Sequence, residues 1–148
     1  MSGSWLYVSS ETTGAGSDHF LFVSKDPPGA PRAAPWAKSG TVAYANGTLF
    51  LAAENDAAFV GWFDLGTGQA VSGPDVFASK NGVLEGMIDL KARFGAVPAT
   101  LYLSVAPYAS PDGGALYPTA QCPATQNSDG NLDASEIATV SVSGITVP

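Results

Sequence analysis

The sequence contains very little of the chemistry on which most enzymes and metal sites depend. Among its 148 residues there is one cysteine, Cys122, and one histidine, His19. A lone cysteine excludes an intrachain disulfide. One cysteine and one histidine together cannot supply the ligands of an ordinary zinc site. The short motifs of serine hydrolases, zinc proteases and nucleotide-binding loops are also missing. We therefore predict a protein without catalytic activity.

Charge is scarce and mostly negative. Charged residues make up 13% of the chain, and six Lys and Arg against 13 Asp and Glu give a formal net charge of −7. Binding to nucleic acid needs clustered basic residues, so the composition excludes a nucleic-acid partner. Apolar runs all fall short of the ~20 residues of a membrane helix, and we expect no membrane span.

Glycine, proline and apolar residues are plentiful instead. The chain has 17 Gly and 11 Pro, and 45% of its residues are hydrophobic. This composition predicts many turns between short strands and enough apolar surface for a substantial core. The length suits one domain, so we expect a single β-sandwich domain over residues 1–148.

The first residues lead directly into strand-like sequence. Residues 1–4 are Met-Ser-Gly-Ser, and no apolar signal-peptide segment precedes the aromatic residues that follow. Together with the Ala-, Gly- and Pro-rich composition, this start indicates a domain taken from a longer, secreted bacterial protein.

Residues 41–65 are the stretch around which the chain is organised. Asn46-Gly47 separates two apolar runs, and this dipeptide accepts the positive φ values of a type I′ hairpin turn. A polar reversal at residues 54–56 leads into a run that is apolar on both faces, with Trp62 and Phe63 on opposite sides. We expect three consecutive strands, the last in the middle of a sheet.

Similar patterns predict the other elements. Asn81-Gly82 is a second hairpin signal, Gly95 closes a short helix over residues 90–95, and turn signals recur at roughly 8–12-residue intervals. The further predicted strands are residues 4–9 and 20–24, one or two short edge strands within residues 70–80, and residues 83–90, 99–108 and 137–147. The sequence therefore predicts an all-β, antiparallel sandwich, jelly-roll-like, of about 8–10 strands with one short helix.

Alternation assigns the faces of two of these strands. In residues 83–90, Leu84 and Ile88 point one way while Glu85 and Met87 point the other, which is typical of a half-buried strand. In residues 99–108 the aliphatic side chains are expected to face the core and Tyr102 and Ser104 to face outward.

A proline-rich connection interrupts the strands at residues 26–35. Its prolines lack the amide donor of a central strand or a helix, so it forms an irregular crossing between two sheets. Trp36 follows it, and we expect Trp36 to be buried and to fix the connection in place.

Residues 125–136 resemble the twelve-residue calcium loop in spacing. Oxygen-bearing side chains recur at alternate positions and Gly130 permits the sharp turn, but Thr125 stands where the first carboxylate belongs. The predicted Ca²⁺ ligands are Asn127, Asp129, Asn131, Asp133 and Glu136. The alternative is a turn rich in Asn and Asp that needs no metal.

A second group of residues is aromatic. Trp62, Tyr102 and Tyr44 are expected to share one sheet face with Glu85 and Met87. Aromatic rings beside carboxylates hold a sugar ring by stacking on its CH face and accepting its hydroxyl groups. The alternative is a second apolar layer, covered by the connection at residues 26–35.

Catalytic and haem sites have little support. Glu85 and Asp89 lie on one strand about 13 Å apart, too far for a pair of catalytic carboxylates. Met87 and His19, or a lysine in place of the histidine, are the conceivable axial ligands of a haem.

Six segments together resemble a known kind of module: DHFLFVSKDPPGA, PWAKSG, AAFVGWFDL, VLEGMIDLKARFG, TLYLSVAPYASPDGGALYP and NSDGNLDASE. They are similar to the β-sandwich modules appended to secreted bacterial proteins, of the broad DOMON and family-9 carbohydrate-binding type. The strand at residues 85–90, the short helix and the aliphatic strand follow that order. The resemblance implies a non-catalytic module for sugars or for haem, with ligand-stacking tryptophans at Trp62 and Trp36.

Two further readings compete with a module that binds polysaccharide or another glycan through Trp62, Tyr102 and Glu85. One is a structural or adhesive module of a surface protein without a small ligand. The other is a haem-binding domain of the DOMON type. Localisation outside a bacterial cell is common to all three.

Overall fold

The computed structural model describes residues 3–11, 16–54, 59–118, 121–123 and 127–142 of the chain. The residues that it describes form eleven strands, one α-helix and one 3₁₀ turn. The strands are β1 (Trp5–Glu11), β2 (Ser17–Ser24), β3 (Arg32–Ala33), β4 (Thr41–Val42), β5 (Leu49–Ala53), β6 (Val60–Asp64), β7 (Ala70–Val71), β8 (Val76–Lys80), β9 (Val83–Asp89), β10 (Thr100–Ala109) and β11 (Ala138–Ser141). The helix is α1 (Leu90–Phe94) and the turn is η2 (Ala134–Glu136).

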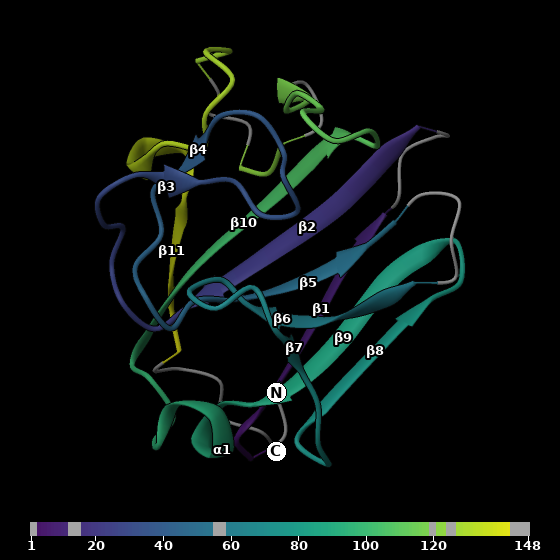
Figure 1. Cartoon of the computed structure of the whole chain (residues 1–148). Helices are drawn as coiled ribbons and strands as arrows, with labels where there is room; N and C mark the ends of the chain where they lie inside the picture. The colour runs from purple at the N-terminus through teal and green to yellow at the C-terminus, as the bar shows by residue number, and fades with distance from the viewer. Residues whose placement is uncertain (1–2, 12–15, 55–58, 119–120, 124–126, 143–148) are drawn as a thin grey trace.

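Two antiparallel sheets make the body of the molecule (Figure 1). One has six strands in the order β11-β10-β2-β5-β6-β7, and the other has three in the order β1-β9-β8. A small ladder of β3 with β4 lies apart from both. This arrangement confirms the predicted all-β, antiparallel, sandwich-like fold, with three of the eleven strands only two residues long.

The main core lies between the two sheets. Alternate residues of β2 and β5 point into it, including Leu21, Val23 and Leu51, and Leu84 and Ile88 meet them from β9. Gly86 lies between Leu84 and Ile88 on β9 because a Cβ there would come within 3.0 Å of the Trp62 ring. The predicted alternation of β9 is therefore confirmed, and it sets the close contact between the sheets.

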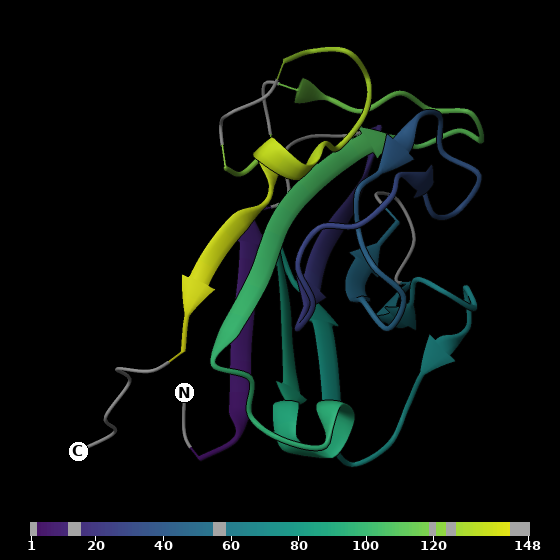
Figure 2. The ribbon, with the colours of Figure 1, turned by 90° about the vertical axis from the view of Figure 1, so that its left-hand side faces the viewer.

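A second apolar layer covers the opposite face of the six-stranded sheet. The phenylalanines of this face pack beneath the segment at residues 34–44 and beneath Leu116 and Leu132 from later loops. The four phenylalanines are Phe20, Phe22, Phe50 and Phe63. We call this surface the covered face. Figure 2 shows the β3 and β4 region on one side of β10 and β1 on the other.

The helix forms as its end signals predict. Asp89 accepts hydrogen bonds from the amides of Lys91 and Ala92, and Gly95 ends the helix with a φ of 82°. The turn at Asn81-Gly82 also joins β8 to β9 as expected, with Gly82 at a φ of 75°. These signals are local, so tertiary contacts do not overturn them.

The first predicted hairpin is wrong. Asn46-Gly47 forms a turn, but the Thr41–Val42 strand before it pairs with β3 and not with β5. Val42, Ala43 and Tyr44 are buried in succession because this segment lies across the covered face, where the ring of Tyr44 stacks on Phe22 at 5.0 Å. Side-chain packing on the covered face thus takes the place of the predicted strand pairing with β5. The predicted reversal at residues 54–56 falls partly on residues 55–58, outside the described residues.

The outward orientation of Tyr102 and Ser104 is also wrong. Both project from β10 on the side away from the main core, but Ser104 is 3% exposed and Tyr102 packs against the covered face. Ser104 shares a 2.9 Å hydrogen bond with Tyr44 from the covering segment. Alternation correctly separates the two faces of the strand, but it does not show that loops bury both of them.

Candidate functional site

The four residues predicted to bind a ligand do not share one surface. Trp62 is 1% exposed in the main core, and its Nε1 donates to the carbonyl of Phe77 at 2.8 Å. Trp36 and Tyr102 are half-buried against the covered face. Trp36 meets the rings of Phe20 and Phe63 edge-on, so it fixes the proline-rich connection as expected.

Glu85 is the one of the four on the outer surface of the three-stranded sheet, and like Trp36 and Tyr102 it is half-buried. It belongs to the side of β9 that points away from the main core. The expectation that Trp62 and Glu85 share a face is wrong, because they lie on opposite sides of the three-stranded sheet. For the covered face the structure confirms the second apolar layer of the alternative reading, but the segment at residues 34–44 covers it and not the connection at residues 26–35.

An aromatic surface does surround Glu85, but other residues build it. Tyr7 on β1 and Phe77 on β8 lie directly opposite Met87 on β9. Tyr7 is 53% exposed and Phe77 is 51% exposed. Since neighbouring strands lie about 4.8 Å apart, the two rings stand roughly 10 Å apart on either side of Met87.

The next pairs on each side of this row complete the surface. Trp5 is opposite Asp89 toward the helix, and Ser9 is opposite Glu85 in the other direction. We call this surface the open face, and its residues are Trp5, Tyr7, Phe77, Glu85 and Met87. It is a flat sheet surface that combines aromatic rings with a carboxylate.

A hydrogen bond ties the rings to the carboxylate. The hydroxyl of Tyr7 donates to Oε1 of Glu85 at 2.5 Å. This bond to Glu85, followed by desolvation and by the charge of the same carboxylate, raises the pKa of Tyr7. Tyr7 is therefore a neutral donor at ordinary pH, and a carboxylate such as that of Glu85 has a second oxygen that can accept a further hydrogen bond.

Asp89, the other carboxylate of this strand, serves the helix. Its pKa is lowered by a hydrogen bond from the Ser4 side chain and by the amides of Ala92 and Lys91. These contacts hold it at the N-terminus of α1. Glu85 is therefore the acidic group of the open face that remains for a ligand.

The predicted calcium loop is organised by its own hydrogen bonds. The two oxygens of Glu136 accept from the amides of Asn127 and Asp133, each at 2.8 Å. Asp129 accepts a hydrogen bond from the amide of Asn131, and this bond is the largest of the contributions that lower the pKa of Asp129. In the part of the chain that the structure describes, His, Cys, Asp and Glu do not gather in threes as metal ligands would.

The remaining predicted ligands have similar roles. Asn131 accepts from both the amide and the hydroxyl of Thr41, which joins the loop to β4. Asp133 accepts from the side chain of Asn127 at 3.0 Å. Thr125 lies outside the described residues. The Asn- and Asp-rich turn is therefore formed, and a calcium ion at the five predicted ligands stays a prediction.

The conceivable haem ligands do not converge. Met87 projects from the open face, whereas His19 is 1% exposed on β2 of the other sheet. Nε2 of His19 lies 3.0 Å from the hydroxyl of Ser17, and burial lowers the pKa of the ring, as does the charge of Lys80. His19 is thus a neutral, internal residue.

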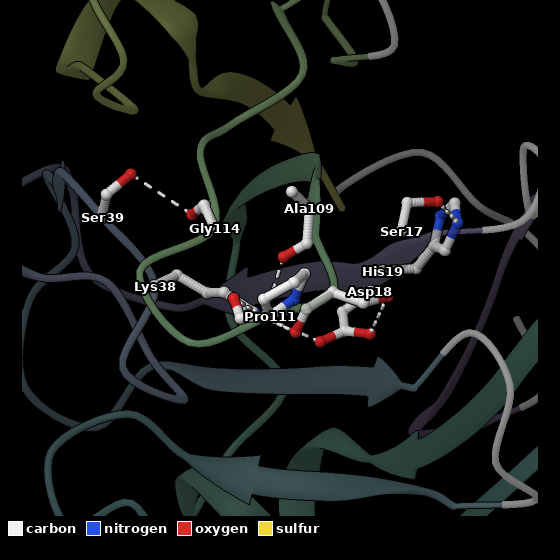
Figure 3. Close-up of polar contacts among 9 residues, drawn as sticks. Ser17, Asp18, His19, Lys38, Ser39, Ala109, Pro111 and Gly114 are labelled. Atoms are coloured by element: carbon white, nitrogen blue, oxygen red, sulfur yellow. Dashed lines mark hydrogen bonds and ion pairs between the residues drawn. The ribbon is translucent and has the colours of Figure 1, made fainter.

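A buried ion pair lies next to His19 (Figure 3). Nζ of Lys38 is 2.8 Å from Asp18, and the two side chains are 1% and 6% exposed. The same Nζ donates to the carbonyls of Ala109, Ser110 and Pro111. All the donors of the ammonium are taken, so the group fastens the 34–44 segment to β2 and to the loop after β10.

Sequence reasoning missed Tyr7 and Phe77, although a signal for Phe77 was present. Glu85 and Met87 were correctly assigned to the outer side of β9, and hairpin pairing through Asn81-Gly82 brings Phe77 opposite Met87. The pairing of β1 with β9 joins residues about eighty positions apart, and no local pattern indicates it.

Comparison with protein-family models, with curated proteins and with solved structures finds no significant match to this chain. Helices long and apolar enough to cross a membrane are absent from the described residues.

Proposed function

We propose that the protein is a non-catalytic carbohydrate-binding module and that the glycan lies across the open face. The observation that carries this proposal is the row of Tyr7, Met87 and Phe77, in which two half-exposed rings flank a flexible apolar side chain. A sugar presents apolar CH faces that stack on such rings and hydroxyl groups at its edges that need acceptors.

The carboxylate supplies the polar half of the interaction. Glu85 is held by Tyr7 at 2.5 Å, so it is positioned beside the ring before a ligand arrives. Its second oxygen can accept a sugar hydroxyl, and a positioned group loses little conformational freedom on binding. A flat face suits an extended polysaccharide, because successive sugar rings can reach Tyr7 and Phe77 together.

Affinity electrophoresis through gels that contain xylan, mannan, soluble β-glucan or hydroxyethyl cellulose tests this proposal. We expect at least one polysaccharide to retard the protein, and Tyr7→Ala or Phe77→Ala to weaken binding about tenfold or more. Tyr117→Ala is the matched control, because Tyr117 is 41% exposed away from the open face. Equal retardation of all variants, or none for the wild type on any polysaccharide, would overturn the proposal.

A second function is favoured by the same exposed rings. An apolar surface bordered by polar residues also suits another protein, so the alternative is a structural or adhesive module. Sedimentation of the wild type at increasing concentration separates the two readings. Self-association that Phe77→Ala abolishes supports the adhesive module, whereas a monomer that binds polysaccharide supports the carbohydrate-binding one.

The proposal extends to location. A module of this kind works outside a bacterial cell, attached to other domains of a longer secreted protein, as the sequence resemblance implies. Export of a reporter fused to the parent protein tests the location directly, and retention of the reporter in the cytoplasm would contradict it.

A further inference from the structure

A pocket opens between the two sheets, where residues of β1 line it together with residues of β2, β10 and β11. Its volume is about 380 Å³, which lies within the range of sites for small molecules. It reaches inward to Val8 and Leu21, both of which belong to the main core. The pocket is therefore continuous with the apolar interior and separate in character from the open face.

The lining of the pocket is aliphatic. None of the residues around it carries a charge. The aliphatic side chains are Val8, Leu21, Leu103, Val105, Ala138 and Val140. Ser104 also lines the pocket, but its hydroxyl is already bonded to Tyr44 at 2.9 Å. A sugar or an ion inside would lose its hydrogen bonds to water without replacement, so the pocket favours an apolar group.

The edge of β1 supplies polar groups at one border of the pocket. The amide of Leu90 donates to the carbonyl of Ser4, so Ser4, Leu6 and Val8 direct their backbone groups toward β9. In an antiparallel pair, successive residues direct their backbone N–H and C=O groups alternately toward and away from the partner strand. The backbone groups of Tyr7 and Ser9 therefore point away from β9. Both line the pocket, and among the described strands β9 alone pairs with β1.

Volume limits the size of the ligand. A water molecule takes about 30 Å³ of liquid, so the pocket has room for roughly a dozen non-hydrogen atoms. A saturated chain of about eight to twelve carbons matches this size and the aliphatic lining. A polar head on such a chain would reach the amides of Tyr7 and Ser9 at the border, which are directed away from β9 and pair with no other described strand.

From these observations we propose that the pocket binds a medium-length acyl chain, with its polar head at the edge of β1. Burial of the chain removes apolar surface from water, and the β1 amides hydrogen-bond the carboxylate or amide head. This site adjoins the open face at Tyr7, which belongs to both, whereas Phe77 and Glu85 do not line the pocket.

Cys122 provides a natural reporter for this proposal. It is the one cysteine of the chain, it is exposed, and it lines the pocket. We expect decanoate to slow the reaction of Cys122 with a thiol reagent in a saturable way. N-decanoylglycine carries the same chain through an amide, so comparing it with decanoate distinguishes a free fatty acid from an acyl chain attached to another molecule. Protection of Cys122 by either compound supports the acyl site.

Two variants fill the pocket from β11. Ala138→Phe and Val140→Phe each place a ring in the space, and both should abolish protection by decanoate while the melting temperature stays close to that of the wild type. Val97→Phe is the matched control, because Val97 is 38% exposed and does not line the pocket. Phe77→Ala should retain protection, even if it loses glycan binding.

The proposal is overturned if decanoate and N-decanoylglycine leave the rate at Cys122 unchanged in the wild type. It is also overturned if both filled variants, folded by circular dichroism, are protected as well as the wild type. If one filled variant unfolds, the other decides the result.

Discussion

The covered face and the open face are both sheet surfaces rich in aromatic side chains, yet they differ in what lies over them. On the covered face, Phe22 and Phe50 are fully buried beneath Tyr44 and its neighbours. On the open face, Tyr7 and Phe77 are half-exposed. Composition and alternation are alike on the two faces, so coverage by distant loops decides which aromatic residues stabilise the fold and which can meet a ligand.

The largest expected effect concerns the ion pair that fastens the cover. Lys38→Met leaves Asp18 charged and buried without its partner, so we expect the free energy of unfolding to fall by about 3–5 kcal/mol. Urea denaturation measures this loss. The double variant Asp18→Asn with Lys38→Met should recover part of it, and a loss below about 1 kcal/mol in the single variant would contradict the role of Lys38.

A matched pair of tyrosines gives the next largest effect. Tyr44→Phe removes the buried hydrogen bond to Ser104 and should lower the free energy of unfolding by about 1 kcal/mol. Tyr7→Phe removes the exposed bond to Glu85, which water can replace, and should change the free energy of unfolding much less. Equal losses in the two variants would show that the faces do not differ in this way.

The pH dependence of stability reports on His19 in the interior. Burial, assisted by the Lys80 charge, lowers its pKa below the ordinary value of 6.5, while Asp18 opposes this shift. The unfolded chain then binds a proton more readily, so the stabilisation is complete above pH 6.5 and is lost as the pH falls through the folded pKa. His19→Gln should make the free energy of unfolding depend less steeply on pH below pH 6.5. Wild-type and variant profiles with the same slope in this range would refute this.

The smallest expected effect is that of a chelator. The loop at residues 127–136 satisfies its amides with Glu136 and Asp129, so we expect EDTA to leave the melting temperature nearly unchanged. A calcium ion at 100 times its Kd would add about 2.7 kcal/mol, which calorimetry detects easily. A clear rise in melting temperature with Ca²⁺ would support the calcium site predicted from the sequence.

The sequence predicts local features of this fold well. The sandwich-like all-β fold, the alternation of β9, the capped helix and the second Asn-Gly turn follow from residues close together in the chain. The place of Trp62 resists such prediction, because Trp62 is in the middle of β6 and contacts with β8 and the main core bury it. Trp36, which the sequence predicts to be buried, is half-buried against the phenylalanines of the covered face.

The candidate site is only half predictable for the same reason. Alternation correctly turns Glu85 outward, but it does not say which strands flank β9 or which loops cover the other sheet. The pairing of Tyr7 with Met87 is a long-range contact, and so is the fastening of Lys38 to Asp18. Such contacts arise from the packing of the whole chain, which a single strand pattern does not contain.

The central claim is that a glycan occupies the open face, and Met87 allows the most direct test. The chain has two methionines, Met1 and Met87, and Met87 lies between Tyr7 and Phe77. With methyl-labelled methionine, titration of a binding polysaccharide should shift the Met87 signal in proportion to occupancy. A polysaccharide that binds while the Met87 signal stays still would contradict the account.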